Sequence, residues 1–161
     1  MSQSVHLWLE ANGEAVEGES SVNTMERENT IECFSFEYGI TAGSEAFSGS
    51  PSGVRNYEPI RITKRVDKST PLLWRALCNN EAINATFKFY RPDTGAGALT
   101  EHFYTVEISE GRIAGIDFVS PDSMMGSNEP PTETISFVYN NMVQTYETTG
   151  AGHQDSFRDQ G

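Results

Sequence analysis

The chain has 161 residues, with 11 Lys or Arg against 23 Asp or Glu, so its formal net charge at pH 7 is -12. This length fits one domain, residues 1–161, that can bury a sizeable core. Binding to nucleic acid or to an anionic membrane depends on Lys and Arg. The charge balance therefore argues against both as partners.

The cysteine count and the N-terminus bear on the compartment. Cys33 and Cys78 are the only cysteines, too few for a disulfide framework or a zinc site, so we expect free thiols. The first residues carry no basic stretch followed by an apolar run of signal-peptide length, and no segment is suited to span a membrane. The sequence alone predicts a cytoplasmic protein.

Alternating apolar residues predict a first strand over residues 5–9, followed by a polar, irregular connection over residues 10–29. A second strand is expected over residues 31–40. Its apolar pattern changes phase at Cys33 and Phe34. A β-bulge at this point would reconcile the two phases, and a strand buried on both faces is the alternative.

Residues 41–58 contain three Gly, four Ser and one Pro, and predict a long surface loop. A loop of this composition can be a disordered tip. Loops of this length in compact domains also commonly serve in binding. Composition alone leaves both interpretations open.

The next segment predicts a half-buried strand followed by a helix. Pro71 suits the first helical position, where no N–H is needed, and Thr70 has the side chain of a helix N-cap. The apolar spacing that follows predicts one helix over about residues 70–79. Three apolar side chains share one face of the preceding strand at a period of two: Ile60, Ile62 and Val66.

Alternating patterns predict strands over residues 83–89 and 103–108. Glu110 and Gly111 then predict a tight hairpin turn, with a return strand over residues 114–118. Further along the chain, the patterns predict a loop, a last strand region and a tail.

Residues 120–132 contain three prolines and predict a loop that cannot pair in a sheet. A last strand region over residues 134–146 is interrupted at Asn140 and Asn141. The polar tail, about residues 148–161, is expected to fray.

Together these elements predict an all-β dominated fold. We expect a β-barrel or a two-sheet sandwich of seven to eight strands with one covering α-helix. A closed barrel can hold a small ligand, and a ligand-binding or protein-binding barrel is therefore one candidate. Four aromatic side chains are expected to fill the interior, which favours a packed core over a cavity: Phe34, Phe36, Phe87 and Phe89.

No residue pattern predicts catalysis. The three histidines, His6, His102 and His153, lie far apart and at no repeated ligand spacing. The run from Gly49 to Gly53 has loop composition and lacks the strand-to-helix setting of a nucleophile elbow. The glycines form no phosphate-binding pattern. We therefore predict no catalytic residue, no metal site, no cofactor and no enzymatic activity.

The run from Thr63 to Leu73, TKRVDKSTPLL, resembles the hallmark sequence of the haemolysin-coregulated protein family. Further segments resemble conserved parts of that family in the same order along nearly the whole chain. They are Val5–Leu9, Phe34–Tyr38, Gly53–Arg55, Phe87–Arg91, Tyr104–Ile108, Glu133–Tyr139 and Asp155–Phe157.

The resemblance implies a structural role as the inner-tube subunit of a bacterial type VI secretion system. Such subunits form hexameric rings that stack into a tube, which a contracting sheath expels, and the rings can carry effector proteins in the lumen. The implied partners are further copies of the chain, the sheath, the tip spike and effectors. Such proteins leave the cell through the secretion system without a signal peptide.

The resemblance also suggests which residues lie at interfaces. The long loop of this family reaches toward the next ring, which would give Gly49, Gly53 and Arg55 a stacking role. Four basic residues cluster in an otherwise acidic chain and are either ordinary solvated surface or charges between subunits: Arg61, Lys64, Arg65 and Lys68.

Overall fold

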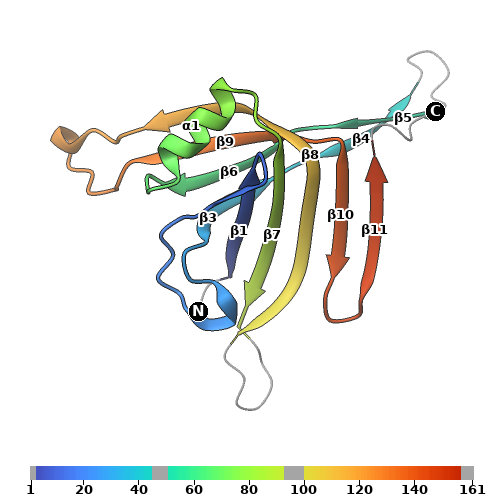
Figure 1. Cartoon of the computed structure of the whole chain (residues 1–161), viewed down its shortest axis with the longest axis horizontal. Helices are drawn as coiled ribbons and strands as arrows, with labels where there is room; N and C mark the ends of the chain where they lie inside the picture. Colours follow the sequence, from blue (N-terminus) through green and yellow to red (C-terminus); the bar gives the residue numbers. More distant parts are fainter. Residues whose placement is uncertain (1–2, 45–50, 93–99, 157–161) are drawn as a thin grey trace.

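The computed structural model describes residues 3–44, 51–92 and 100–156. This part of the chain is dominated by β-strands, with one α-helix, as the sequence predicts (Figure 1). The strands are β1 Ser4–Ala11, β2 Glu14–Val16, β3 Ile31–Glu37, β4 Ile40–Ser44, β5 Pro51–Tyr57, β6 Ile60–Arg65, β7 Ile83–Arg91, β8 Glu101–Val119, β9 Thr132–Val138, β10 Asn141–Tyr146 and β11 Ala151–Ser156. The helices are α1 Thr70–Cys78 and the short 3-10 turns η1 Thr24–Glu26 and η2 Ser123–Met125.

Six strands close into a barrel. Their order is β8–β7–β1–β3–β6–β9, and β9 pairs back onto β8. Every pairing is antiparallel. Two further strands, β10 and β11, extend the sheet from the first half of β8, and β2 pairs with the end of β1. Figure 1 shows the β10–β11 extension beside β8.

The long strand β8 makes this closure possible, and here the expected hairpin is wrong. The chain does not turn back at Glu110 and Gly111 but continues as one strand from Glu101 to Val119. Glu110 has a left-handed φ of 52°, and Gly111 lies so close to β9 that an added Cβ would meet the Val138 carbonyl oxygen at 2.8 Å. The two residues therefore bend β8, whose first half pairs with β7 and β10 and whose second half pairs with β9.

Alternating side chains of the strands fill the barrel. Leu7 on β1, Phe87 on β7, Ile135 and Phe137 on β9 are fully buried. Phe36 and Phe89 pack against this core, as expected. Phe34 does not, because its ring is 50% exposed beneath the Arg65 guanidinium. The predicted bulge explains this, since the register of β3 against β6 shifts between Cys33 and Ser35.

Two segments that were expected to be irregular contain strands. Residues 41–58 supply most of β4 and all of β5, which pair with each other as a separate two-stranded sheet. The tail expected to fray supplies β11, which pairs with β10 along its whole length. Neither segment shows an alternating apolar pattern in its sequence, so periodicity could not predict these strands.

The helix α1 packs against β8 and lies at one end of the barrel (Figure 1). Its inward face buries Leu73 and Ala76. The N-cap residue is Ser69 and not Thr70, and no side chain caps the helix by a hydrogen bond. Among the residues that the structure describes, no helix is long and apolar enough to cross a membrane.

Candidate functional site

The hallmark run contains a buried charge network. The Lys64 side chain on β6 is fully buried, and its Nζ lies 2.6 Å from Glu133 Oε1 on β9. The same Nζ lies 3.1 Å from Asp67 Oδ1 and donates to the Arg65 carbonyl oxygen at 2.9 Å. Two carboxylates and a carbonyl therefore surround one ammonium group, which compensates for its removal from water.

The same network fixes the start of α1. The Thr70 hydroxyl accepts a hydrogen bond from the Asp67 backbone N–H at 3.1 Å and donates to Glu133 Oε1 at 3.0 Å. The Ser69 backbone N–H donates to Asp67 Oδ1 at 2.9 Å, and the Ser69 hydroxyl donates to the same oxygen. Thr70 thus joins the turn before the helix to β9, instead of capping the helix.

These contacts distinguish Lys64 from the three other basic residues that were candidates for subunit contacts. Lys64 points into the protein and is used within the chain. Arg61, Arg65 and Lys68 are exposed, and they remain candidates for contacts with other chains. Lys68 lies 3.6 Å from the exposed Glu17 carboxylate, and Arg65 lies 5.0 Å above the Phe34 ring.

The β4–β5 hairpin projects from the barrel near β10 and β11 (Figure 1). An ion pair joins its second strand to the C-terminal strand. Arg55 Nε lies 2.7 Å from Asp155 Oδ2, and Arg55 Nη2 lies 3.0 Å from Oδ1, so both carboxylate oxygens are bound. Gly53 lies in β5, and Gly49 lies outside the described residues.

Aromatic groups pack behind this ion pair. The Tyr38 hydroxyl accepts from Gln144 Nε2 at 2.8 Å, which joins the start of the hairpin to β10. The Tyr57 and Tyr139 rings meet edge to face at 5.9 Å, and burial raises the pKa of Tyr139 to about 12. These contacts fix the base of the hairpin to the barrel.

The three histidines occupy separate environments. His6 is buried, and its Nδ1 lies 2.8 Å from the Thr30 hydroxyl oxygen. Because that hydroxyl already donates to the Arg27 carbonyl oxygen, Nδ1 carries the proton that His6 donates. Burial and the neighbouring Arg27 lower the pKa of His6 to about 4. Burial also lowers the pKa of His102, which lies on β8.

Neither histidines nor thiols form a reactive cluster in the part of the chain that the structure describes. No group of three His, Cys, Asp or Glu residues there could hold a metal ion. Cys33 and Cys78 are both free thiols, and burial raises the pKa of the Cys33 thiol.

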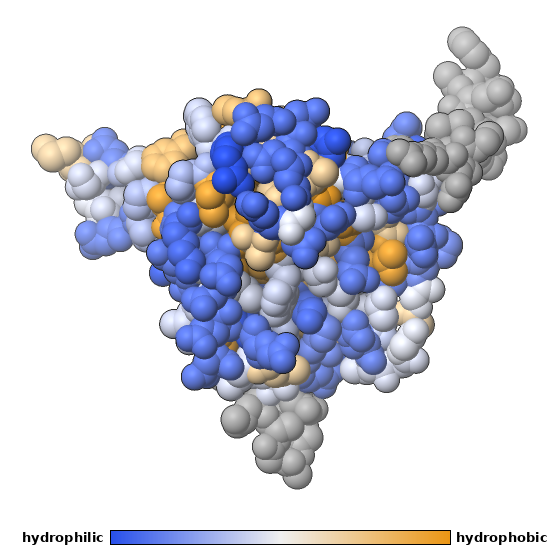
Figure 2. All heavy atoms as spheres, viewed as in Figure 1, coloured by the Kyte–Doolittle hydropathy of each residue, from blue (hydrophilic) through white to orange (hydrophobic). Residues whose placement is uncertain are grey.

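A second projection carries four exposed apolar side chains. The end of β8, the η2 turn and the start of β9 form an arm, defined by residues 117–133, that Figure 2 shows with orange surface at its outer part. Met124 is 92% exposed and Met125 is 83% exposed, and Phe118 and Val119 are also exposed. The sequence predicted a loop over residues 120–132, and the two adjacent methionines in it were the signal for an exposed apolar surface. Exposed apolar surface of this kind commonly marks an interaction site.

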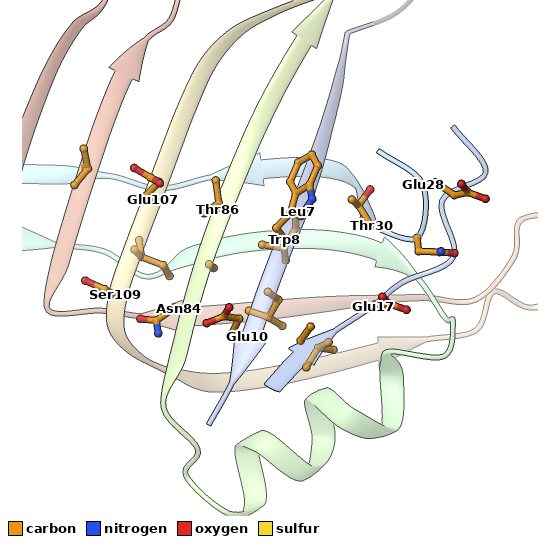
Figure 3. Close-up of a pocket in the computed structure, with 17 residues that line it drawn as sticks. Leu7, Trp8, Glu10, Glu17, Glu28, Thr30, Asn84, Thr86, Glu107 and Ser109 are labelled. Atoms are coloured by element: carbon orange, nitrogen blue, oxygen red, sulfur yellow. The ribbon is translucent and has the colours of Figure 1, made fainter. Parts of the chain in front are cut away.

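A hollow of about 570 Å³ lies on the outer face of β1, β7, β8 and β10 (Figure 3). Segments 15–17 and 28–30 contribute to its lining. Trp8 and Glu107 are among the residues that line it. No pattern in the sequence predicted this hollow, because its lining comes from strands far apart in the chain.

The barrel interior is filled by side chains, while the hairpin, the apolar arm and the hollow all face outward. This arrangement defines a closed antiparallel barrel whose distinctive features lie on its outer surface. The family model described as "Type VI secretion system effector, Hcp" matches residues 8–146. The chain belongs to this Hcp family.

One curated relative is the major exported protein of Pseudomonas aeruginosa. It is 30% identical over 130 residues, which cover 76% of this chain and 72% of the relative. Together with the family match, this relative identifies the chain as an exported protein of type VI secretion.

Solved structures share the fold. A crystal structure of an Hcp protein has a TM-score of 0.85 at 24% identity and covers 98% of this chain and 99% of its own. The Hcp1 protein of Escherichia coli EAEC 042 has a TM-score of 0.82 at 23% identity, and the match covers 96% of this chain and 98% of that protein. The secreted protein Hcp3 of P. aeruginosa has a TM-score of 0.76 at 20% identity, with 98% and 100% covered.

Proposed function

We propose that the chain is a structural inner-tube subunit. Copies close into hexameric rings, the rings stack into a tube that the type VI system expels, and the lumen can carry effector proteins. The observation that supports this most strongly is the β4–β5 hairpin, which projects from the barrel and is fixed at its base by Arg55 and Asp155. A projection with a rigid base is suited to reach a neighbouring ring.

Exposed sheet edges support ring closure. Strand β11 ends one side of the sheet, with β10 as its one strand partner among the described strands. Such edges invite pairing with another chain, and a closed cyclic ring uses every edge in the same way. The apolar arm with Met124 and Met125 offers surface that burial in an assembly would stabilise.

Exposed basic side chains can fix how neighbouring copies align with each other. Arg61, Arg65 and Lys68 stand on a chain of net charge -12, so acidic surface is available on any neighbour. Complementary charges across an interface fix orientation more than they add affinity. In this proposal Lys64 has no part at the interface, because Glu133 and Asp67 hold it within the chain.

The proposed role is structural and not enzymatic. Its partners are further copies, the sheath, the tip spike and effectors. The rival proposal is a small-ligand or protein-binding barrel outside a tube. The barrel interior, packed with residues such as Leu7, Phe87 and Phe137, disfavours the small-ligand form of that rival.

A loop replacement tests the stacking role. Residues 44–53 are replaced by Asn-Gly, a pair that forms tight hairpin turns, so that the Ala42–Arg55 pairing of β4 and β5 is kept. We expect an unchanged melting temperature and ring mass, with loss of stacked tubes in electron micrographs and loss of secretion. Normal tubes and normal secretion from the variant would refute the stacking role of the hairpin.

A further inference from the structure

The hollow on the outer sheet face is built from aligned cross-strand rows. Trp8 on β1 lies opposite Thr86 on β7, which lies opposite Glu107 on β8, which lies opposite Val143 on β10. One row along, Glu10 lies opposite Asn84. Figure 3 shows the labelled side chains of both rows on the same face of the sheet.

The carboxylates in these rows are unpaired. Glu10 and Glu107 are exposed, and neither side chain forms a hydrogen bond or an ion pair with any residue in 3–44, 51–92 or 100–156. Glu28 and Glu17 add two carboxylates on the opposite wall, and Glu17 lies 3.6 Å from Lys68. The lining of the hollow therefore carries four carboxylates, one of which is offset by Lys68.

The Trp8 ring already binds a cation. Lys88 Nζ lies 4.5 Å from the centroid of the ring, within the range of a cation–π interaction. Lys88 reaches it from β7, one same-face position beyond Thr86. The Lys88 contact shows that the Trp8 ring accepts a cation, and a cationic side chain of a partner could displace the lysine.

We propose that this hollow binds an extended, basic segment of another protein, with an Arg or Lys side chain against Trp8 and further cations at Glu10 and Glu107. Charge complementarity favours this occupant, because the lining offers carboxylates and an aromatic face to a cation. The proposal does not depend on ring formation or on the proposed tube role.

The geometry disfavours a single bound ion. Among the described residues, no group of three His, Cys, Asp or Glu side chains could hold a metal ion, whereas calcium needs six to eight oxygen ligands around it. A segment with several separated cations can reach both carboxylates at once. Nucleic acid is also disfavoured, because its phosphates would meet the same carboxylates.

The test uses Trp8 as its own reporter. Trp8 and Trp74 are the two tryptophans, and Trp74 is exposed on α1, so W74F leaves Trp8 as the only indole. The probe is the peptide acetyl-(Arg-Ser)4-amide, titrated into the full-length W74F protein. We expect saturable binding that changes Trp8 emission and protects the indole from acrylamide quenching. The peptide acetyl-(Glu-Ser)4-amide should produce neither effect.

Two variants of equal charge distinguish binding in the hollow from general attraction of the peptide to an acidic protein. In the W74F protein, E10Q/E107Q should weaken binding about fivefold to tenfold, as expected for two solvent-accessible ion pairs. The control E58Q/E129Q removes the same charge from exposed positions outside the hollow and should change affinity by less than about twofold. Equal losses in both variants, or binding that leaves Trp8 emission unchanged, would overturn the proposal.

Oligomeric state provides a further check. If a second copy of the chain covers the hollow, Trp8 will be shielded from acrylamide in the assembled protein before any peptide is added. The peptide will then fail to bind the assembly. That result would also overturn the proposal and assign the hollow to an interface between copies.

Discussion

Lys64 and Glu133 lie directly opposite each other in the register of β6 and β9 and form a buried ion pair, with Nζ 2.6 Å from Oε1. The Thr70 hydroxyl donates to the same carboxylate oxygen from the first turn of α1. One side-chain cluster therefore joins two barrel strands to the helix. Burying both charges is costly, and the hydrogen bonds of Asp67 and Thr70 offset that cost.

Removing one partner should destabilise the protein strongly. Glu133→Leu leaves the Lys64 ammonium buried without its closest carboxylate, and we expect the free energy of unfolding to fall by about 3–5 kcal/mol. Urea denaturation followed by far-ultraviolet circular dichroism measures this loss.

The double variant Lys64→Met/Glu133→Leu is the control. Because it removes both charges of the Lys64–Glu133 pair, and Asp67 keeps its hydrogen bonds from Ser69, it should recover part of the stability that Glu133→Leu loses. A double variant as unstable as the single one would contradict the ion-pair account and point to packing at Glu133.

His6 should make stability depend on pH. Its pKa in the folded protein is lowered to about 4, against an ordinary value of 6.5, so the unfolded chain binds a proton more readily between these pH values. The stabilising effect of neutral His6 is complete above pH 6.5 and is lost as the pH falls toward 4. We expect this loss to be about 3 kcal/mol.

His6→Asn provides the comparison, since carboxylates also titrate over this range. The unfolding free energies of both proteins are measured from pH 7.5 to pH 4 by urea denaturation. The difference between them should shrink as the pH falls. Parallel pH profiles would show that His6 titrates normally, in spite of its burial against Tyr90 and Thr30.

The inward face of α1 should not tolerate a charge. Leu73→Asp places a carboxylate at a fully buried position, and we expect unfolding or a loss of free energy of unfolding on the order of 4 kcal/mol. Trp74→Gln, one residue along on the exposed face, should change stability by less than about 1 kcal/mol. Thermal unfolding distinguishes the two, and equal melting temperatures would contradict the observed helix orientation.

The Arg55–Asp155 pair should hold β11 locally. Both side chains are partly exposed, so Arg55→Gln should cost about 1 kcal/mol or less in global stability. It should nevertheless raise the amide exchange rates of Ala151–Ser156 by about threefold to tenfold, because the strand opens more often. Arg75→Gln, which breaks the ion pair between Arg75 on α1 and Glu81 beyond the end of the helix, should leave those rates unchanged. Unaffected exchange in the Arg55 variant would refute the anchoring role.

The sequence predicted the elements that alternate against the core, such as β1, β6 and β7, because burial of one strand face imposes a period of two. Of the two interpretations that the phase change at Cys33 and Phe34 left open, the structure has the β-bulge. The same period places Lys64 on the buried face with Ile60 and Ile62, although its charge suggested the surface. Its partner Glu133 is distant in sequence, and only the closed barrel brings the two together.

Other features depended on tertiary contacts that a local pattern does not record. Glu110 adopts a left-handed φ within a strand because β8 must bend between two sets of partners, and locally this looks like a hairpin turn. The outer hollow combines strands and loops distant in sequence. Periodicity could place Trp8 and Glu10 on the outer face of β1. It could not show which residues of β7 and β8 lie beside them.

The solution mass of the purified protein tests the central proposal most directly. Light scattering coupled to size exclusion, at low and high salt and over a range of protein concentrations, measures it. Ring formation predicts a mass of about 107 kDa, six times the 17.8 kDa of one chain. A mass of 17.8 kDa under every condition would contradict ring formation by this chain and favour the protein-binding barrel.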